Sequence, residues 1–195
     1  GIDGAGPVTA SIDKLFDSAD QITGGPELWL YFGSGRYYFK NSTAGIDSAD
    51  DRMAIYGIKE PCYSTGSVPK GYDSACTTAL SLSTLTDQSA DNPNISLLSG
   101  KTDGWFITLD ATSSTTKAER VITTPSAKTN GLVQFTTFKP TADICGYGGE
   151  TLFWFVNYNL GTAPSSGLMK GKILIQLSSG AIVVVDLSDI SGTSR

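Results

Sequence analysis

Short runs of apolar and aromatic residues recur along the chain, each bounded by Gly, Pro, Asn or Asp. The runs are about five residues long and rich in β-branched and aromatic side chains, a pattern that predicts β-strands. The sequence predicts strands at residues 28–32, 53–58, 105–109, 120–123, 132–138, 152–157, 173–177 and 182–187. Between the last two, Ser178-Ser179-Gly180 predicts a hairpin turn in which Gly180 supplies a positive φ.

Helical periodicity is scarce. Residues 12–19 and 77–86 have apolar positions near helical spacing, and we expect each to form a short helix at most, because Ser and Thr compete with helix hydrogen bonds. The chain therefore predicts an all-β fold. No linker or strict repeat divides it, so 1–195 is interpreted as one β-rich domain in which 61–100 form a long loop or insertion.

The absence of histidine narrows the chemistry more than any motif does. The chain has 195 residues and no His, which excludes Ser-His-Asp and Cys-His nucleophile systems, His-ligated zinc and the facial triad of non-haem iron. A domain of this length removes about 70% of its unfolded surface from water, so it needs no metal to fold. We assign no catalytic residue.

The charge and hydropathy of the chain exclude two further possibilities, a nucleic-acid partner and a membrane-spanning helix. Lys+Arg number 14 against 19 Asp+Glu, a net charge of −5, and no three basic residues are adjacent. A nucleic-acid partner needs a basic face, so none is expected. The longest apolar runs, 152–156 and 181–185, are too short for a membrane-spanning helix.

Three cysteines indicate the redox compartment. Cys62 and Cys76 flank a segment rich in turn residues, and a bridge closing about 15 residues offsets about 3 kcal/mol of chain entropy. We predict a Cys62–Cys76 disulfide, which implies an oxidising compartment; the alternative is two reduced thiols on a surface loop. Cys145 is then left over, either buried or bridged to a residue outside this chain.

An acidic loop is the one candidate metal site. Asp47, Asp50 and Asp51 offer hard oxygen ligands of the kind calcium prefers, but the alternating Asp-x-Asp-x-Asp-Gly pattern is absent. A solvated turn is the preferred interpretation, and no metal site is assigned.

Carboxylates and tryptophans raise a carbohydrate alternative. Asp103 lies just before Trp105, and Glu150 just before Phe153 and Trp154, which makes these two carboxylates the glycosidase candidates. Trp29, Trp105 and Trp154 fit either a sugar-stacking platform or a core, and aromatic residues in strands more often belong to the core.

Six motifs follow one another in order along residues 28–157. They are LYFGSGRY at 30–37, YGI at 56–58, GW at 104–105, ERV at 119–121, FTTFKP at 135–140 and CGYGG at 145–149. This order resembles the C-terminal region of the PilC/PilY family of type IV pilus tip-associated adhesins and biogenesis factors.

The resemblance implies a β-propeller. Eight strands make about two four-stranded blades, whereas a propeller has about four to eight, so we expect a partial propeller with a long irregular loop. The chain opens on Gly1 without an initiator Met, and we interpret it as a piece of a longer protein.

The resemblance also implies a function: a non-enzymatic protein of the pilus tip or outer membrane, exported through the periplasm, that acts in pilus assembly, adhesion and twitching motility. Its expected partners are pilus minor subunits or a surface or host ligand. Family members carry a calcium loop upstream of the YFG strand, which has no counterpart here, so no cofactor is assigned. The alternative is a secreted carbohydrate-binding or glycosidase-like β domain.

Overall fold

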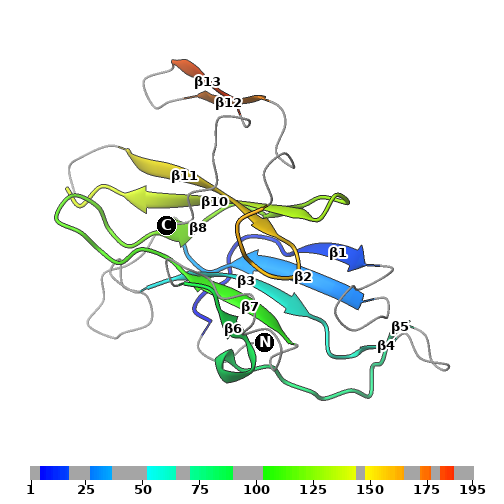
Figure 1. Ribbon diagram of the computed structural model, residues 1–195. Coiled ribbons are helices and arrows are strands. Elements are labelled where there is room, and N and C mark those ends of the chain that lie inside the picture. Colours follow the sequence, from blue (N-terminus) through cyan, green and yellow to red (C-terminus); the bar gives the residue numbers. More distant parts are fainter. Residues whose placement is uncertain are drawn as a thin grey trace.

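The computed structural model describes residues 5–17, 27–36, 52–64, 71–89, 103–143, 148–164, 172–176 and 181–186 (Figure 1). Within these ranges the chain is built from β-strands in two larger sheets and two small two-stranded ladders, with one 3-10 turn and no α-helix. The predicted all-β class is confirmed. No helix in the described ranges has the length and apolar composition needed to span a membrane.

The first sheet has five strands in the order β1-β2-β3-β7-β6. They are β1 (Asp13–Asp17), β2 (Glu27–Gly33), β3 (Ala54–Lys59), β7 (Gly104–Thr108) and β6 (Thr86–Asp87). The first four pair antiparallel and β6 pairs parallel to β7. All six residues of β3 are buried or half-buried, because this strand has neighbours on both sides and apolar layers on both faces.

The second sheet is centred on one long strand. It comprises β8 (Arg120–Val121), β9 (Ser126–Ala127), β10 (Leu132–Pro140) and β11 (Gly149–Asn157). From Val133 to Pro140, burial along β10 alternates with period two, so Val133, Phe135, Thr137 and Lys139 share the inward face. Pro140, which cannot donate a ladder hydrogen bond, ends the strand.

Two short ladders complete the described structure. They are β4 (Tyr63–Ser64) with β5 (Gly71–Tyr72), and β12 (Lys172–Gln176) with β13 (Ile182–Asp186). The antiparallel pairing of the last two predicted strands is confirmed; the predicted turn residues 178–180 lie outside the described ranges.

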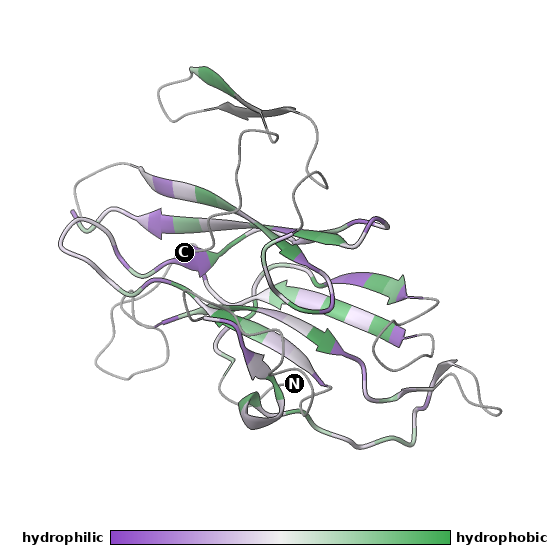
Figure 2. Ribbon diagram, in the orientation of Figure 1, coloured by the Kyte–Doolittle hydropathy of each residue, from purple (hydrophilic) through white to green (hydrophobic). Residues whose placement is uncertain are grey.

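The main core lies between the two sheets, and a second core covers the other face of the first sheet. The inter-sheet core includes Trp29, Tyr31, Ile55, Trp105, Ile107, Leu109, Val121, Val133, Phe135 and Val156. The second includes Phe32, Ala54, Tyr56, Ile58, Leu80 and Leu85. Figure 2 shows hydrophobic residues concentrated along β2, β3 and β7, the strands that both cores share.

Both predicted helices are corrected. Residues 12–19 contain the strand β1, because Lys14 and Phe16 alternate in exposure with their neighbours as the segment pairs along β2. Residues 77–86 contain a 3-10 turn, Leu82–Thr84, and the first residue of β6, but no α-helix. In its described parts the long loop 61–100 is not entirely irregular, since it holds β4, β5 and β6.

Candidate functional site

The glycines of the LYFGSGRY motif lie against the ERV motif at the junction of the two sheets. A Cβ at Gly33 would lie 2.2 Å from Cγ2 of Val121, and a Cβ at Gly35, whose φ is +144°, would lie 2.6 Å from Cβ of Arg120. The Val121 N–H donates to the Ser34 carbonyl at 2.9 Å. The Gly-x-Gly pattern therefore permits close backbone packing at the end of β2.

The YGI and GW motifs make a second close approach. A Cβ at Gly57 would lie 2.4 Å from Cε2 of Trp105, and a Cβ at Gly161 would lie 2.5 Å from Cδ2 of the same ring. The Trp105 indole N–H donates to the Tyr158 carbonyl at 2.9 Å. Trp105 is fully buried and Trp29 is 3% exposed, so neither can stack on a sugar at the surface.

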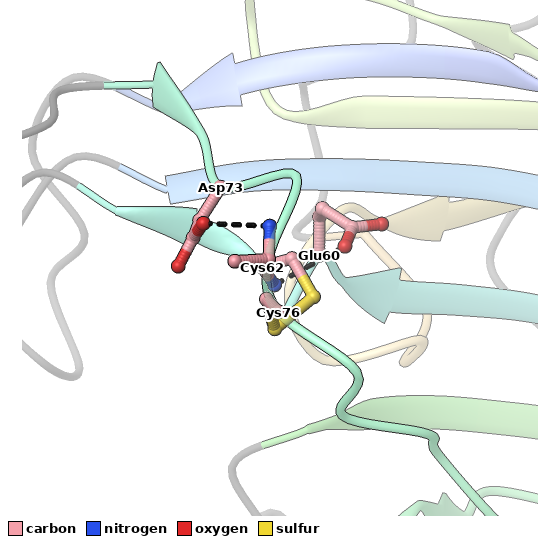
Figure 3. Close-up of a disulfide and its surroundings, with 5 residues drawn as sticks. Glu60, Cys62, Asp73 and Cys76 are labelled. Carbon is pink, nitrogen blue, oxygen red and sulfur yellow. Dashed lines mark hydrogen bonds between the residues drawn. A yellow bond between two sulfur atoms is a disulfide. The ribbon is translucent and has the colours of Figure 1, made fainter.

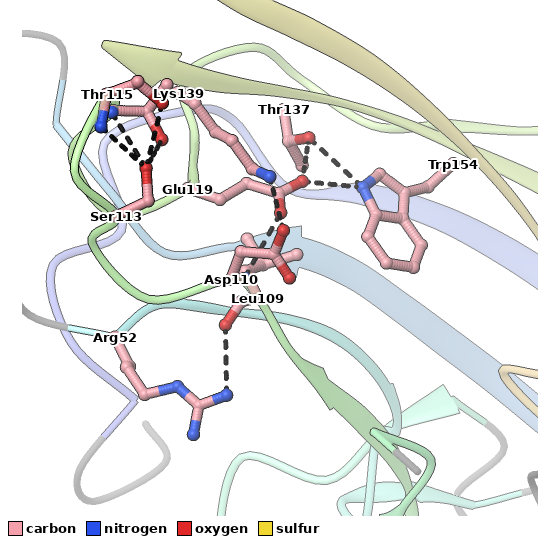
Figure 4. Close-up of polar contacts among 10 residues, drawn as sticks. Arg52, Leu109, Asp110, Ser113, Thr115, Glu119, Thr137, Lys139 and Trp154 are labelled. Carbon is pink, nitrogen blue, oxygen red and sulfur yellow. Dashed lines mark hydrogen bonds and ion pairs between the residues drawn. The ribbon is translucent and has the colours of Figure 1, made fainter. Parts of the chain in front are cut away.

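A buried polar network holds the second sheet together (Figure 4). One carboxylate oxygen of Glu119 accepts from the Thr137 hydroxyl and, at 3.0 Å, from the Trp154 indole N–H. The other accepts from the backbone N–H of Asp110 at 3.2 Å. The Asp110 carboxylate in turn pairs with the Lys139 ammonium. Glu119 is completely buried, so its carboxylate joins elements of the fold and cannot be reached by a substrate.

Arg120 makes a second buried polar link. Its guanidinium donates twice to the Ala118 carbonyl, at 3.1 and 3.0 Å, and once to the Arg36 carbonyl at 3.3 Å. It thereby connects β8 to the chain that follows β2. Sequence analysis found the ERV motif but not this role. The sequence signal for this role was the pair of adjacent charged residues, Glu119 and Arg120, at the start of the predicted strand 120–123.

Tyr31, inside β2, makes a further buried polar contact in the inter-sheet core. Its hydroxyl donates to the Tyr158 carbonyl at 3.2 Å, and the Tyr158 hydroxyl donates to the Asp17 carboxylate. Burial raises the pKa of Tyr31 far above its ordinary value, and nearby Tyr158, Asp17 and Asp13 raise it further. Tyr31 therefore stays protonated and acts as a structural donor.

The predicted disulfide between Cys62 and Cys76 is present and anchors a small lobe (Figure 3). The Cys62 N–H donates to the Glu60 carboxylate at 3.1 Å, and the Asp73 N–H donates to the Cys62 carbonyl at 2.8 Å. Cys62 is 7% exposed. The disulfide thus fixes the short β4–β5 ladder against the end of β3.

Tyr63 and Tyr72 of this lobe and Phe16 of β1 form a cluster of aromatic side chains that we call the aromatic patch. Phe16 is 53% exposed and Tyr72 is 66% exposed. The Phe16 and Tyr63 rings meet edge to face, 5.8 Å between centroids, and Tyr63 is the cross-strand partner of Tyr72. Exposed aromatic rings on a rigid support are typical of contact surfaces. The aromatic patch is the candidate binding site, and no sequence pattern marked it.

The other candidate residues are dispersed or lie outside the described ranges. Asp47, Asp50, Asp51 and Cys145 are outside them. Glu150 is exposed at the start of β11, opposite Lys139, and Asp103 is half-buried just before β7. No group of three or more metal-binding side chains occurs in the part of the chain that the structure describes.

Removing the disulfide tests its contribution to stability. The double variant Cys62→Ala/Cys76→Ala is expected to lose up to about 3 kcal/mol of unfolding free energy, because the bridge no longer restricts the unfolded chain. Urea unfolding with and without reductant measures this loss. Reductant should lower the stability of the wild type to that of the variant and leave the variant unchanged. Equal stability of the oxidised wild type and the variant would contradict this role.

Comparison of the chain with models of protein families, with curated proteins and with solved structures finds no match.

Proposed function

We propose that the chain is the C-terminal, β-propeller-like part of a PilC/PilY-type protein of the type IV pilus. It is a non-enzymatic component of pilus biogenesis, surface adhesion and twitching motility. One observation carries this proposal: the motifs that bear the resemblance contact one another. Gly33 meets Val121, and Gly57 meets Trp105, although each pair is far apart in sequence. Motifs that match by chance have no reason to form one packed unit.

The two sheets are proposed to be neighbouring propeller blades. Strands β1, β2, β3 and β7 form a four-stranded antiparallel order, as a propeller blade does. The second sheet packs face to face on it through the inter-sheet core. This arrangement supports the proposal of a partial propeller.

The proposed location is the cell surface, at the pilus tip or outer membrane, reached by export through the periplasm. A disulfide is typical of such oxidising compartments. The proposed partner is a pilus minor subunit or a ligand on a surface or host, contacted through the aromatic patch. The net charge of −5 disfavours nucleic acid. No residue of this chain is proposed to bind calcium.

Deletion of the region that encodes residues 27–157 tests the proposal in the bacterium of origin. We expect fewer surface pili, slower twitching and weaker attachment, all restored by a wild-type copy. Normal piliation, twitching and attachment in the deletion strain would refute the pilus role.

A carbohydrate-binding role is the second candidate, favoured by the exposed rings of the aromatic patch. Its probe is the double variant Phe16→Ala/Tyr72→Ala, since Trp105 lies in the core. Ile12→Ala, which removes an apolar side chain that is 54% exposed, is the matched control. Glycan-array binding lost only in the double variant would support this role. Hydrolysis abolished by Glu150→Gln would indicate a glycosidase. No glycan binding by the wild type would reject the carbohydrate role.

A further inference from the structure

The edge of β11 lacks the features that normally protect an exposed strand edge. Among the described strands, β10 is the only neighbour of β11. From Thr151 to Asn157 the strand carries no charged residue and no proline. Residues 152–155 are four consecutive apolar side chains, all half-buried. Because neighbouring side chains in a strand point to opposite faces, β11 is apolar on both of them.

The other described edges of the two larger sheets are protected, and in the second sheet the strands β8 and β9 on the far side of β10 have only two residues each. Edge strand β1 carries Asp13, Lys14 and Asp17, and edge strand β6 is only two residues long. Charged side chains and short length are the usual means of preventing further strand pairing. The contrast indicates that the edge of β11 is covered in the assembled protein.

The β12–β13 hairpin has the same character. It forms its own two-stranded sheet and stands apart from β11 (Figure 1). In β13, Ile182 is 66%, Val183 39% and Val184 55% exposed, and these consecutive residues lie on both faces of the strand. Figure 2 shows β13 as hydrophobic. A two-stranded hairpin is at best marginally stable alone in water, so this one needs a partner.

After β11 the chain turns toward the edge of this strand that faces away from β10. The Tyr158 N–H donates to Gly131 on the β10 side, whereas the preceding N–H, that of Asn157, donates to the Thr162 carbonyl at 2.9 Å. Successive amides of a strand point to opposite edges, so Thr162 lies at the free edge. The Asn157 side chain holds this turn through Thr162 and Ala163, at 3.0 and 3.1 Å. The segment leading to the hairpin therefore starts beside the edge that lacks a neighbour.

We propose that two copies of this chain form a two-fold dimer in which each β12–β13 hairpin adds to the free edge of β11 in the other copy. One chain carries both halves of the contact: a strand edge without charge from Thr151 to Asn157, and an apolar hairpin whose two charged residues, Lys172 and Asp186, lie opposite each other at one end. Exchange of identical elements closes a symmetric dimer and leaves neither half exposed. Among the described strands the hairpin pairs with no other strand of its own chain, which leaves it available to a second copy. The dimer is independent of the pilus role.

Light scattering after size-exclusion chromatography, over a range of protein concentrations, tests the proposal on the full chain. We expect the wild type to have twice the mass of the chain and Val184→Lys to be monomeric, because a lysine on an edge strand opposes pairing. Ile12→Lys is the matched control, since Ile12 is 54% and Val184 55% exposed. We expect this control to remain dimeric.

A complementation experiment separates loss of pairing from misfolding. Phe153→Lys places the charge on β11 instead of the hairpin, and we expect it to be monomeric as well. A mixture of Val184→Lys and Phe153→Lys retains one intact hairpin and one intact edge, so it should form a mixed dimer. A monomeric wild type would overturn the proposal, whether or not the backbone amides of its hairpin are protected from hydrogen exchange. So would a dimeric Val184→Lys, a monomeric Ile12→Lys or a mixture that stays monomeric.

Discussion

Replacing Gly57 with alanine is expected to lower the free energy of unfolding by about 3 kcal/mol, the upper part of the range for overpacking a core. The new Cβ would lie 2.4 Å from Cε2 of Trp105. The ring cannot move away freely, because Gly161 lies against it and its N–H is bonded to the Tyr158 carbonyl. Urea or guanidinium unfolding measures the loss.

A double-mutant cycle with Trp105→Phe shows whether the loss has this cause. Phenylalanine lacks Nε1 and one ring of the indole, which relieves the overlap with a Cβ at position 57. Gly57→Ala should therefore cost markedly less in the Trp105→Phe background than in the wild type. Strict additivity of the two substitutions would show that the indole does not explain the requirement for glycine.

Replacing Glu119 with leucine is expected to cost at least about 2 kcal/mol, since each of two donors that lose their acceptor costs about 1 kcal/mol or more. These donors are the Thr137 hydroxyl and the Asp110 backbone N–H, whereas the Trp154 indole N–H keeps the Thr137 hydroxyl oxygen as an acceptor at 3.2 Å. Denaturant unfolding is again the measurement.

Two milder variants make the Glu119 prediction specific. Glu119→Gln keeps the shape and one acceptor oxygen, and Thr137→Val removes one donor and leaves the other two paired. Each should cost less than Glu119→Leu, at about 1 to 2 kcal/mol. A leucine variant as stable as the wild type would mean that the network does not hold the second sheet together.

Much of the strand content was predictable because the central strands are continuous apolar runs. β3 and β7 lie between two apolar layers, and such strands are recognised by composition and length alone. Two-residue strands such as β4 and β9 are too short to show any periodicity. β1 was missed because its five residues, DKLFD, show no period-two alternation of apolar and charged positions, so that the strand is decided by pairing with β2.

The site was less predictable than the fold. The disulfide followed from loop composition, since Cys62 and Cys76 flank a segment rich in turn residues. The burial of Glu119 and Arg120 depends on partners distant in the sequence; Arg36, for example, lies 84 residues from Arg120. Exposure of Phe16 and Tyr72 is likewise a tertiary property. The motif glycines were partly predictable. The sequence shows where they are, but it does not show which side chains pack against them and so require glycine.

The most direct test of the pilus role is the location of the protein in the bacterium that makes it. Cells expressing the full-length protein with an epitope tag within this region are sheared, and the tag is quantified in the detached pilus fraction and in the cell bodies. The proposed role predicts tag in the pilus fraction, and its loss from that fraction in a strain lacking the major pilin. Tag confined to the cell bodies or the medium, with pili detached normally, would contradict it.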